Sequence, residues 1–200
     1  MTIDFEKLKN HHPYAIMDGN CRQSAVCIPL IENGGSYDVL FEVRSSKVEN
    51  EPGDICFPGG MIEQGETYRE TAVREMCEEL GVDPSQIEIL GDAEYMHNPN
   101  LTVYPVATIL KDYSGSYSAD EVAEVFTVPL SFFAENDPDI YSMEWKPQIN
   151  DDFPFHLVNG GRSYGWRKQI QSYVFWQYEN RIIWGITAKI LYHFIKEFEK

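Results

Sequence analysis

GGMIEQGETYRETAVREMCEELGV, residues 59–82, is the stretch that decides the fold, because it joins a glycine pair to a predicted helix rich in glutamate. The helix is predicted from about Thr67 to Leu80, and Gly81 stands where a left-handed C-terminal cap belongs. At about 100° per residue the predicted helix has an apolar face and, nearly opposite, an acidic one. The two sets are Val73, Met76, Cys77 and Leu80, and Glu75, Glu78 and Glu79.

The three glutamates are spaced i, i+3 and i+4, so their carboxylates can converge on one side of the helix. By itself this pattern is typical of a solvated acidic face. The preceding glycines change the interpretation, because they let the backbone come close to a phosphate. Hard cations such as Mg²⁺ take oxygen ligands and often share them with substrate phosphates. The stretch therefore predicts a site for a divalent cation and a phosphorylated substrate.

The same stretch resembles the Nudix box, which reads Gly, five residues, Glu, seven residues, then Arg-Glu-apolar-any-Glu-Glu-any-Gly-apolar. The positions that carry the resemblance are Gly60, Glu66, Arg74, Glu75, Glu78, Glu79 and Gly81, with apolar Met76 and Val82. The resemblance implies an αβα sandwich with a mixed β-sheet between helices, an α/β (α+β) fold. It also implies hydrolysis of a pyrophosphate by water that a bound metal ion activates.

The resemblance assigns roles to individual residues. Glu75, Glu78 and Glu79 are expected to bind Mg²⁺ or Mn²⁺, with the carbonyl of Gly60 as a further ligand. Arg74 either holds a box carboxylate in orientation through a charge-assisted pair or forms an ion pair of little weight on the helix surface. Glu66 is expected to serve loop geometry and the pair with Arg74.

Nudix enzymes commonly use one more carboxylate from outside the box as a base or ligand. The segment ADEVAEVF offers two candidates, Glu121 and Glu124, just before a predicted strand. They are three residues apart and could face one site, and the sequence leaves the choice open because a general base is defined by its distance to the proton it takes.

A narrower resemblance is to coenzyme A diphosphatases, through residues 39–60, 121–133 and 182–191. Its core is Arg44-Ser45, Gly53 and Phe57-Pro58-Gly59-Gly60. It implies cleavage of coenzyme A, or an acyl or oxidised form, into 3′,5′-ADP and 4′-phosphopantetheine. Arg44, Gly59 and Gly60 are the expected substrate-binding residues.

Two positions depart from that pattern, because Glu49 and Glu51 stand where the family often has Arg and His. Hydrolysis of ADP-ribose, NADH or another nucleoside diphosphate derivative is therefore the nearer alternative. A ligand-binding or regulatory module that keeps the fold without turnover is the other, since fold does not fix function.

The rest of the chain predicts one domain over residues 1–200, with a polar lead-in at 1–23. Two runs around Asn33-Gly34-Gly35 predict a hairpin, at 24–31 and 37–44. Further strands are expected at 86–96, 101–110, 124–133, the last ending in a helical turn, and in the later segments IYSMEW, FHLV and QSYVFWQY. Apolar residues at three- and four-residue steps predict a packed terminal helix over 183–200.

Composition excludes several classes of function. The net charge is −16, from 16 Lys and Arg against 32 Asp and Glu, which disfavours binding to nucleic acid. No apolar run is long enough to span a membrane and the N-terminus lacks the apolar core of a signal, so we expect a cytoplasmic protein that does not bind membranes. The spacing of the four cysteines favours buried free thiols over disulfides or a zinc site. The sequence is compatible with a homodimer but does not predict one.

Overall fold

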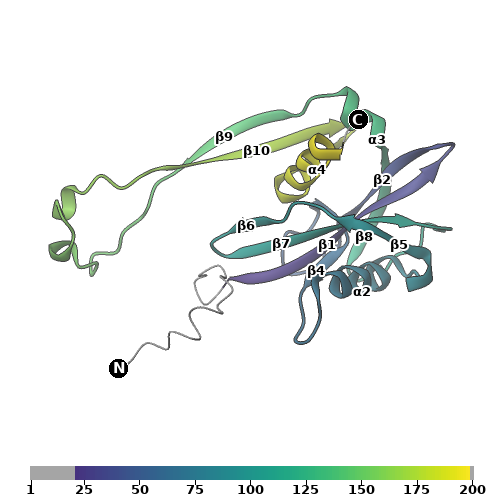
Figure 1. Ribbon diagram of the computed structural model, residues 1–200, viewed down its shortest axis with the longest axis horizontal. Coiled ribbons are helices and arrows are strands. Elements are labelled where there is room, and N and C mark those ends of the chain that lie inside the picture. Colours follow the sequence, from purple (N-terminus) through teal and green to yellow (C-terminus); the bar gives the residue numbers. More distant parts are fainter. Residues whose placement is uncertain (1–20, 199–200) are drawn as a thin grey trace, which may run out of the picture.

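A mixed β-sheet forms the centre of the molecule in the computed structural model, which describes residues 21–198 (Figure 1). Strand β1 (Arg22–Asn33) pairs antiparallel with β2 (Ser36–Arg44) and parallel with β7 (Leu101–Leu110). The main path is β3-β2-β1-β7-β5, and β4, β6 and β8 pair with β1, β7 and β2. The remaining strands are β3 (Ile55–Cys56), β4 (Gly59–Met61), β5 (Ile87–Asp92), β6 (Met96–Asn98) and β8 (Val122–Pro129). The predicted hairpin is confirmed.

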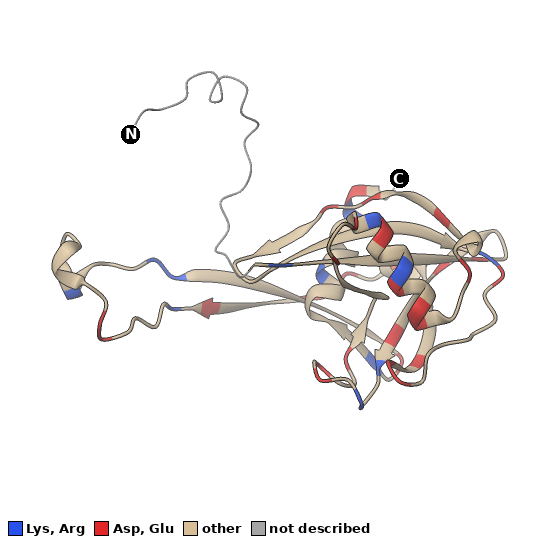
Figure 2. Ribbon diagram, turned by 90° about the horizontal axis from the view of Figure 1, so that it is seen from below, with Lys and Arg blue, Asp and Glu red and all other residues tan. Residues whose placement is uncertain are grey.

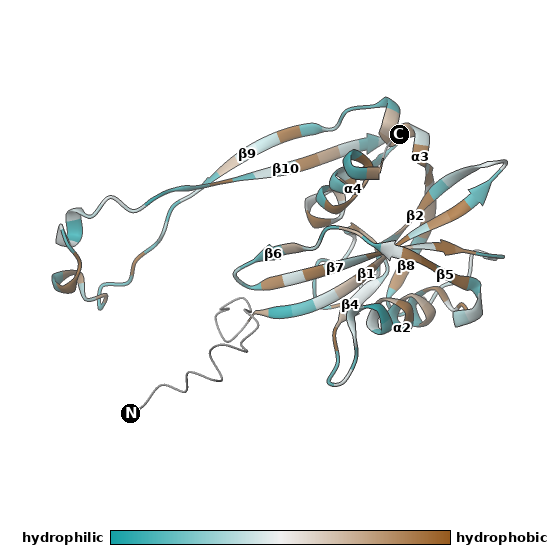
Figure 3. Cartoon of the chain, viewed as in Figure 1, coloured by the Kyte–Doolittle hydropathy of each residue, from teal (hydrophilic) through white to brown (hydrophobic). Residues whose placement is uncertain are grey.

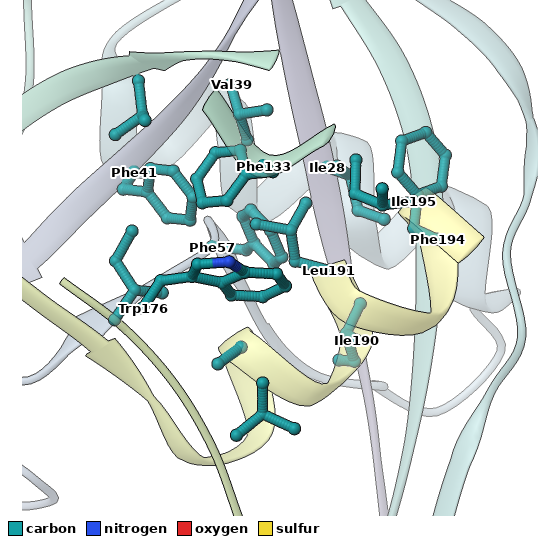
Figure 4. Packing of buried hydrophobic residues seen from close by; sticks show 14 of the residues in the cluster. Ile28, Val39, Phe41, Phe57, Phe133, Trp176, Ile190, Leu191, Phe194 and Ile195 are labelled. Carbon is teal, nitrogen blue, oxygen red and sulfur yellow. The ribbon is translucent and has the colours of Figure 1, made fainter. Parts of the chain in front are cut away.

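Helices cover both faces of this sheet, which confirms the αβα sandwich. On one face, α2 (Tyr68–Leu80) packs its Ala72, Met76 and Leu80 against Cys27 and Leu40. On the other face, α4 (Gly185–Phe198) and the short α3 (Leu130–Glu135) enclose a second core. Figure 4 shows that core, in which Leu191 of α4 lies among the aromatic rings of Phe41, Phe57, Phe133 and Trp176.

The ends of α2 follow from local signals. The Thr67 side chain accepts a hydrogen bond from the Glu70 amide, and the Glu70 side chain accepts one from the Thr67 amide, so two amides without helical partners are satisfied. Gly81 ends the helix with φ 63°, a left-handed conformation that glycine adopts without strain. The predicted helix boundaries are thus confirmed to within a residue.

The predicted faces of α2 are wrong in part. The buried residues are Thr71, Ala72, Met76, Glu79 and Leu80, whereas Val73 and Cys77 are partly exposed. The physical reason is that the helix approaches the sheet through its smallest side chain, Ala72, which is fully buried. This rotates Glu79 toward the sheet and Val73 away from it.

A second, three-stranded sheet carries a long hairpin that extends away from the sandwich (Figure 1). It consists of β9 (Asp139–Trp145), β10 (Gln169–Tyr178) and β11 (Arg181–Trp184). Figure 3 shows apolar segments on the projecting strands, where Ile140, Tyr141 and Ile170 are exposed.

Two predictions about the C-terminal part are corrected. FHLV is not a strand: Phe155–Leu157 forms a single 3₁₀ turn after Pro154, and the Phe155 ring packs edge-on against Phe153, 5.1 Å between centroids. The terminal helix begins at Gly185 rather than 183, because Ile182 and Ile183 pair with β10 as part of β11.

Three other expectations concern the N-terminal lead-in, membrane-spanning helices and the cysteines. Most of the lead-in, residues 1–20, lies outside them. Within residues 21–198 no helix is both long and apolar enough to cross a membrane. The four cysteines are free as predicted, but only Cys27 is fully buried, and the other three are partly exposed.

Candidate metal and phosphate site

The two glycines of the loop bring backbone directly against the carboxylates of α2. Strand β4 pairs with β1 through Gly59 and Gly60, opposite Val26 and Ala25. The Gly59 amide donates a hydrogen bond of 2.8 Å to Oε2 of Glu79. A Cβ at Gly60 would overlap the carboxylate of Glu75, so glycine lets the backbone lie directly against this side chain.

Glu79 of α2 and Glu42 of β2 are buried carboxylates that lie close enough for their charges to interact. Their exposed fractions are 4% and 1%. Burial raises the pKa of both, and the charge of Glu42 adds to the effect on Glu79. The Cys56 thiol donates to Oε1 of Glu42 at 3.2 Å, while Oε2 of Glu42 has no hydrogen-bond partner. An unpaired buried carboxylate oxygen is costly, which points to a partner of positive charge.

Sequence reasoning missed Glu42. It stands on β2 between Phe41 and Val43, where a glutamate looks like the solvent-facing position of a half-buried strand. In the fold this face of β2 lies under α2, since neighbouring Leu40 packs in the α2 core. The only signal in the sequence was a glutamate inside an otherwise apolar strand.

Arg74 gathers the other acidic side chains of the stretch. Its guanidinium donates to Oε1 of Glu66 at 2.7 Å, to Oε1 of Glu75 at 2.9 Å and to Oε2 of Glu78 at 3.2 Å. The Thr71 hydroxyl also donates to Glu66. Hydrogen bonding to Arg74 lowers the pKa of Glu66 to about 2. Of the two interpretations of Arg74, this geometry favours the orienting pair, because three carboxylates share one rigid donor.

Glu75 and Glu78 differ in their surroundings. Half-burial raises the pKa of Glu75, and the hydrogen bond from Arg74 partly opposes that rise. Glu78 is exposed, with 56% of its side chain accessible. Figure 2 shows acidic residues along α2, the helix nearest the viewer. The side chains of the three box glutamates therefore range from exposed, at Glu78, to buried, at Glu79.

The two carboxylates proposed from outside the box have different neighbours. Glu121 precedes β8, and its charge raises the pKa values of Glu42, Glu75 and Glu79, so it lies near the buried pair. Glu124 pairs with Arg181 of β11, whose guanidinium lies over the ring of Phe126, 4.4 Å from its centroid. Phe126 stacks on Phe41 in the core of the opposite face. The geometry favours Glu121 over Glu124.

Arg44 lies at the end of β2, where the chain leaves the sheet for the loop that leads to Gly59. Its Nε donates to the Asn50 carbonyl at 3.0 Å, and its backbone amide donates to the Asp54 carbonyl. Glu51 adopts a positive φ of 52° in this loop and, like Arg44, lines a cavity beside Cys56. Glu49 is exposed and is not among the residues that line this cavity.

The donor set fits a hard divalent cation. Within residues 21–198, no three His, Cys, Asp or Glu side chains already converge on a point that could hold a metal ion. The side chains nonetheless offer carboxylate oxygens around one glycine loop, and one buried oxygen, Oε2 of Glu42, lacks a partner. Carboxylates and carbonyls are the ligands that Mg²⁺ and Mn²⁺ prefer.

Alanine at Gly59 and at Gly60 should act differently. A Cβ at Gly59 would overlap backbone, including Val26 Cα at 2.7 Å, so Gly59→Ala is expected to destabilise the fold by about 1–3 kcal/mol. A Cβ at Gly60 would overlap only the movable Glu75 side chain, so Gly60→Ala should fold while losing Mg²⁺ binding. Thermal melts with and without Mg²⁺ would separate the two, and equal losses of stability would contradict this account.

Comparisons with known proteins place these residues in a family context. The model of the Nudix domain matches residues 22–142. The mouse (Mus musculus) peroxisomal coenzyme A diphosphatase NUDT7 is 38% identical over 135 residues, which cover 66% of this chain and 56% of that protein. The Caenorhabditis elegans peroxisomal coenzyme A diphosphatase ndx-8 is 36% identical over 121 residues, covering 57% of this chain and 52% of that protein. This chain spans about half the length of both relatives.

Solved structures are also similar. A crystal structure of an Ap4A hydrolase from C. elegans has a TM-score of 0.48 at 16% identity, covering 57% of this chain and 84% of that one.

Proposed function

The chain belongs to the Nudix domain family, and from this premise we propose that it is a metal-dependent hydrolase of the pyrophosphate bond in a nucleoside diphosphate derivative. We further propose that the substrate is coenzyme A or acyl-coenzyme A, cleaved to 3′,5′-ADP and 4′-phosphopantetheine or its acyl form. The observation that carries the proposal is the buried pair of Glu42 and Glu79 against the Gly59 amide.

The residues act on three parts of the reaction. Glu75, Glu78, Glu79 and Glu42 would hold Mg²⁺ or Mn²⁺, with the Gly60 carbonyl as a further oxygen. Bound metal would offset the charge of the pyrophosphate and lower the pKa of an attacking water. Glu121 would accept a proton from that water. Arg74 holds Glu75 and Glu78 by hydrogen bonds, which limits the positions that their carboxylates adopt.

The choice of coenzyme A is supported by the segment from Arg44 to Gly60 and by relatives whose names state this activity. ADP-ribose and NADH remain the alternatives, because Glu49 and Glu51 replace basic residues of that segment. A cytoplasmic location stays a prediction, and the two relatives are named as peroxisomal proteins. We expect the protein to bind a small nucleotide, and to bind neither nucleic acid nor membranes.

Product analysis tests the proposal. Purified protein is incubated with coenzyme A, ADP-ribose and NADH, each with Mg²⁺, with Mn²⁺ and with EDTA. We expect 3′,5′-ADP from coenzyme A in the presence of either metal and no product in EDTA, because the carboxylates cannot stabilise phosphate charge without a cation. AMP from ADP-ribose or NADH alone would overturn the coenzyme A assignment and keep the hydrolase. Turnover in EDTA would overturn the metal mechanism.

A further inference from the structure

A cavity of about 270 Å³ lies on the side of the sheet that α4 covers, opposite α2. It is enclosed by the loop after β2, by β6, by β10 and by the start of α4. It adjoins the candidate metal site through Cys56, which lines the cavity and donates to Glu42. The side chains that matter for its chemistry are Arg44, Glu51, Asp54, Asn98, Trp184 and Lys189.

Two cations, Arg44 and Lys189, line this cavity. Acidic residues outnumber basic ones two to one, 32 against 16. Within residues 21–198 neither Arg44 nor Lys189 forms a side-chain ion pair, although Glu51 and Asp54 line the same cavity. A cation that no carboxylate contacts directly is available to an anionic ligand.

An aromatic side chain lies in the same wall. The Trp184 ring is 41% exposed and stacks on Phe175, with centroids 5.8 Å apart and 11° between the planes. Stacking holds one face of the indole in place. A planar base can then bind the rest of its surface at little cost in side-chain entropy.

We propose that this cavity binds the adenosine 3′-phosphate portion of the substrate, with the base on Trp184 and the 3′-phosphate on Lys189. The inference rests on the proposed function. Its volume is slightly below the roughly 300–1,000 Å³ of pockets that hold a whole ligand, which suits one half of an extended molecule. The pyrophosphate would then lie toward Cys56 and the carboxylates, with Arg44 between. Lys189 and Trp184 lie outside residues 22–142, which the Nudix model matches, and within residues 182–191, which resemble coenzyme A diphosphatases.

The test is equilibrium binding of 3′,5′-ADP and 5′-AMP by calorimetry, with no metal added and no turnover required. Wild type should bind 3′,5′-ADP about tenfold more tightly than 5′-AMP, as expected of one charge-assisted phosphate contact. Lys189→Ala should remove that preference and leave 5′-AMP binding unchanged. Trp184→Leu should weaken both nucleotides equally. Lys196→Ala is the matched control, since Lys196 is on the same helix and lies over the Tyr192 ring.

Each outcome bears on one hypothesis. Equal binding of the two nucleotides by wild type, or a preference that survives Lys189→Ala, would overturn this inference. If coenzyme A is cleaved but 3′,5′-ADP does not bind, the inference fails and the proposed function stands. If coenzyme A is not cleaved but the Lys189-dependent preference is present, the cavity assignment stands and the proposed function fails.

Discussion

Glu79→Gln is expected to reduce turnover by about 10²–10³-fold while the protein stays folded. Glutamine can still accept the hydrogen bond from the Gly59 amide, so the loop geometry is kept. It cannot supply the negative charge that a divalent cation needs. Removing one of several neighbouring carboxylates also relieves repulsion from Glu42 and Glu75, so we expect a melting temperature equal to or above that of wild type.

The melting temperature, measured with and without metal, tests the same variant without any substrate. Mg²⁺ or Mn²⁺ should raise the melting temperature of wild type, because a ligand that binds only the folded state stabilises it. Glu79→Gln should lose that rise, and Glu135→Gln, at the exposed end of α3, should keep it. If Glu79→Gln kept both the turnover of wild type and its rise in melting temperature with metal, Glu79 would not be a metal ligand.

Glu42→Gln is expected to lower turnover and raise stability together. Without metal, the buried and partly unpaired Glu42 carboxylate opposes folding, and its neutral replacement should stabilise the protein by about 1–3 kcal/mol. With metal, the lost ligand should cost about 10–100-fold in turnover. Thermal melts and initial rates of the same preparations measure both changes.

The opposite signs separate a functional Glu42 from a structural one. If Glu42 only packed the strand, the substitution would leave turnover unchanged. Glu88→Gln is the control, because Glu88 is also a strand glutamate but pairs with Lys111 at the surface, where such pairs contribute little. A fall in both stability and turnover for Glu42→Gln would contradict the proposed role.

The local parts of the site could be predicted from the sequence because their signals are local. The helix ends depend on Thr67, Glu70 and Gly81, each within one turn of the group it satisfies. Glu66 and Arg74, which the sequence pattern led us to expect as partners, form an ion pair. The hairpin of β1 and β2 follows from a glycine turn between two apolar runs.

Tertiary contacts decided what a helical projection could not. Which side of α2 is buried depends on how closely the sheet approaches it, so Glu79 became buried while Val73 and Cys77 stayed partly exposed. The choice between Glu121 and Glu124 likewise depends on Arg181, which comes from β11 and holds Glu124 on the other face.

The sequence by itself determined the Nudix box, its helix and the kind of chemistry that its carboxylates can perform. Only the tertiary structure revealed Glu42 as part of the cluster and placed Lys189 in a cavity beside it. The reason is that both arrangements join segments far apart in the chain: α2 covers the face of β2 that bears Glu42, and the start of α4 lines the same cavity as the loop that follows β2. No short-range periodicity carries that information, since a strand shows its alternation but not which of its faces a distant helix will cover.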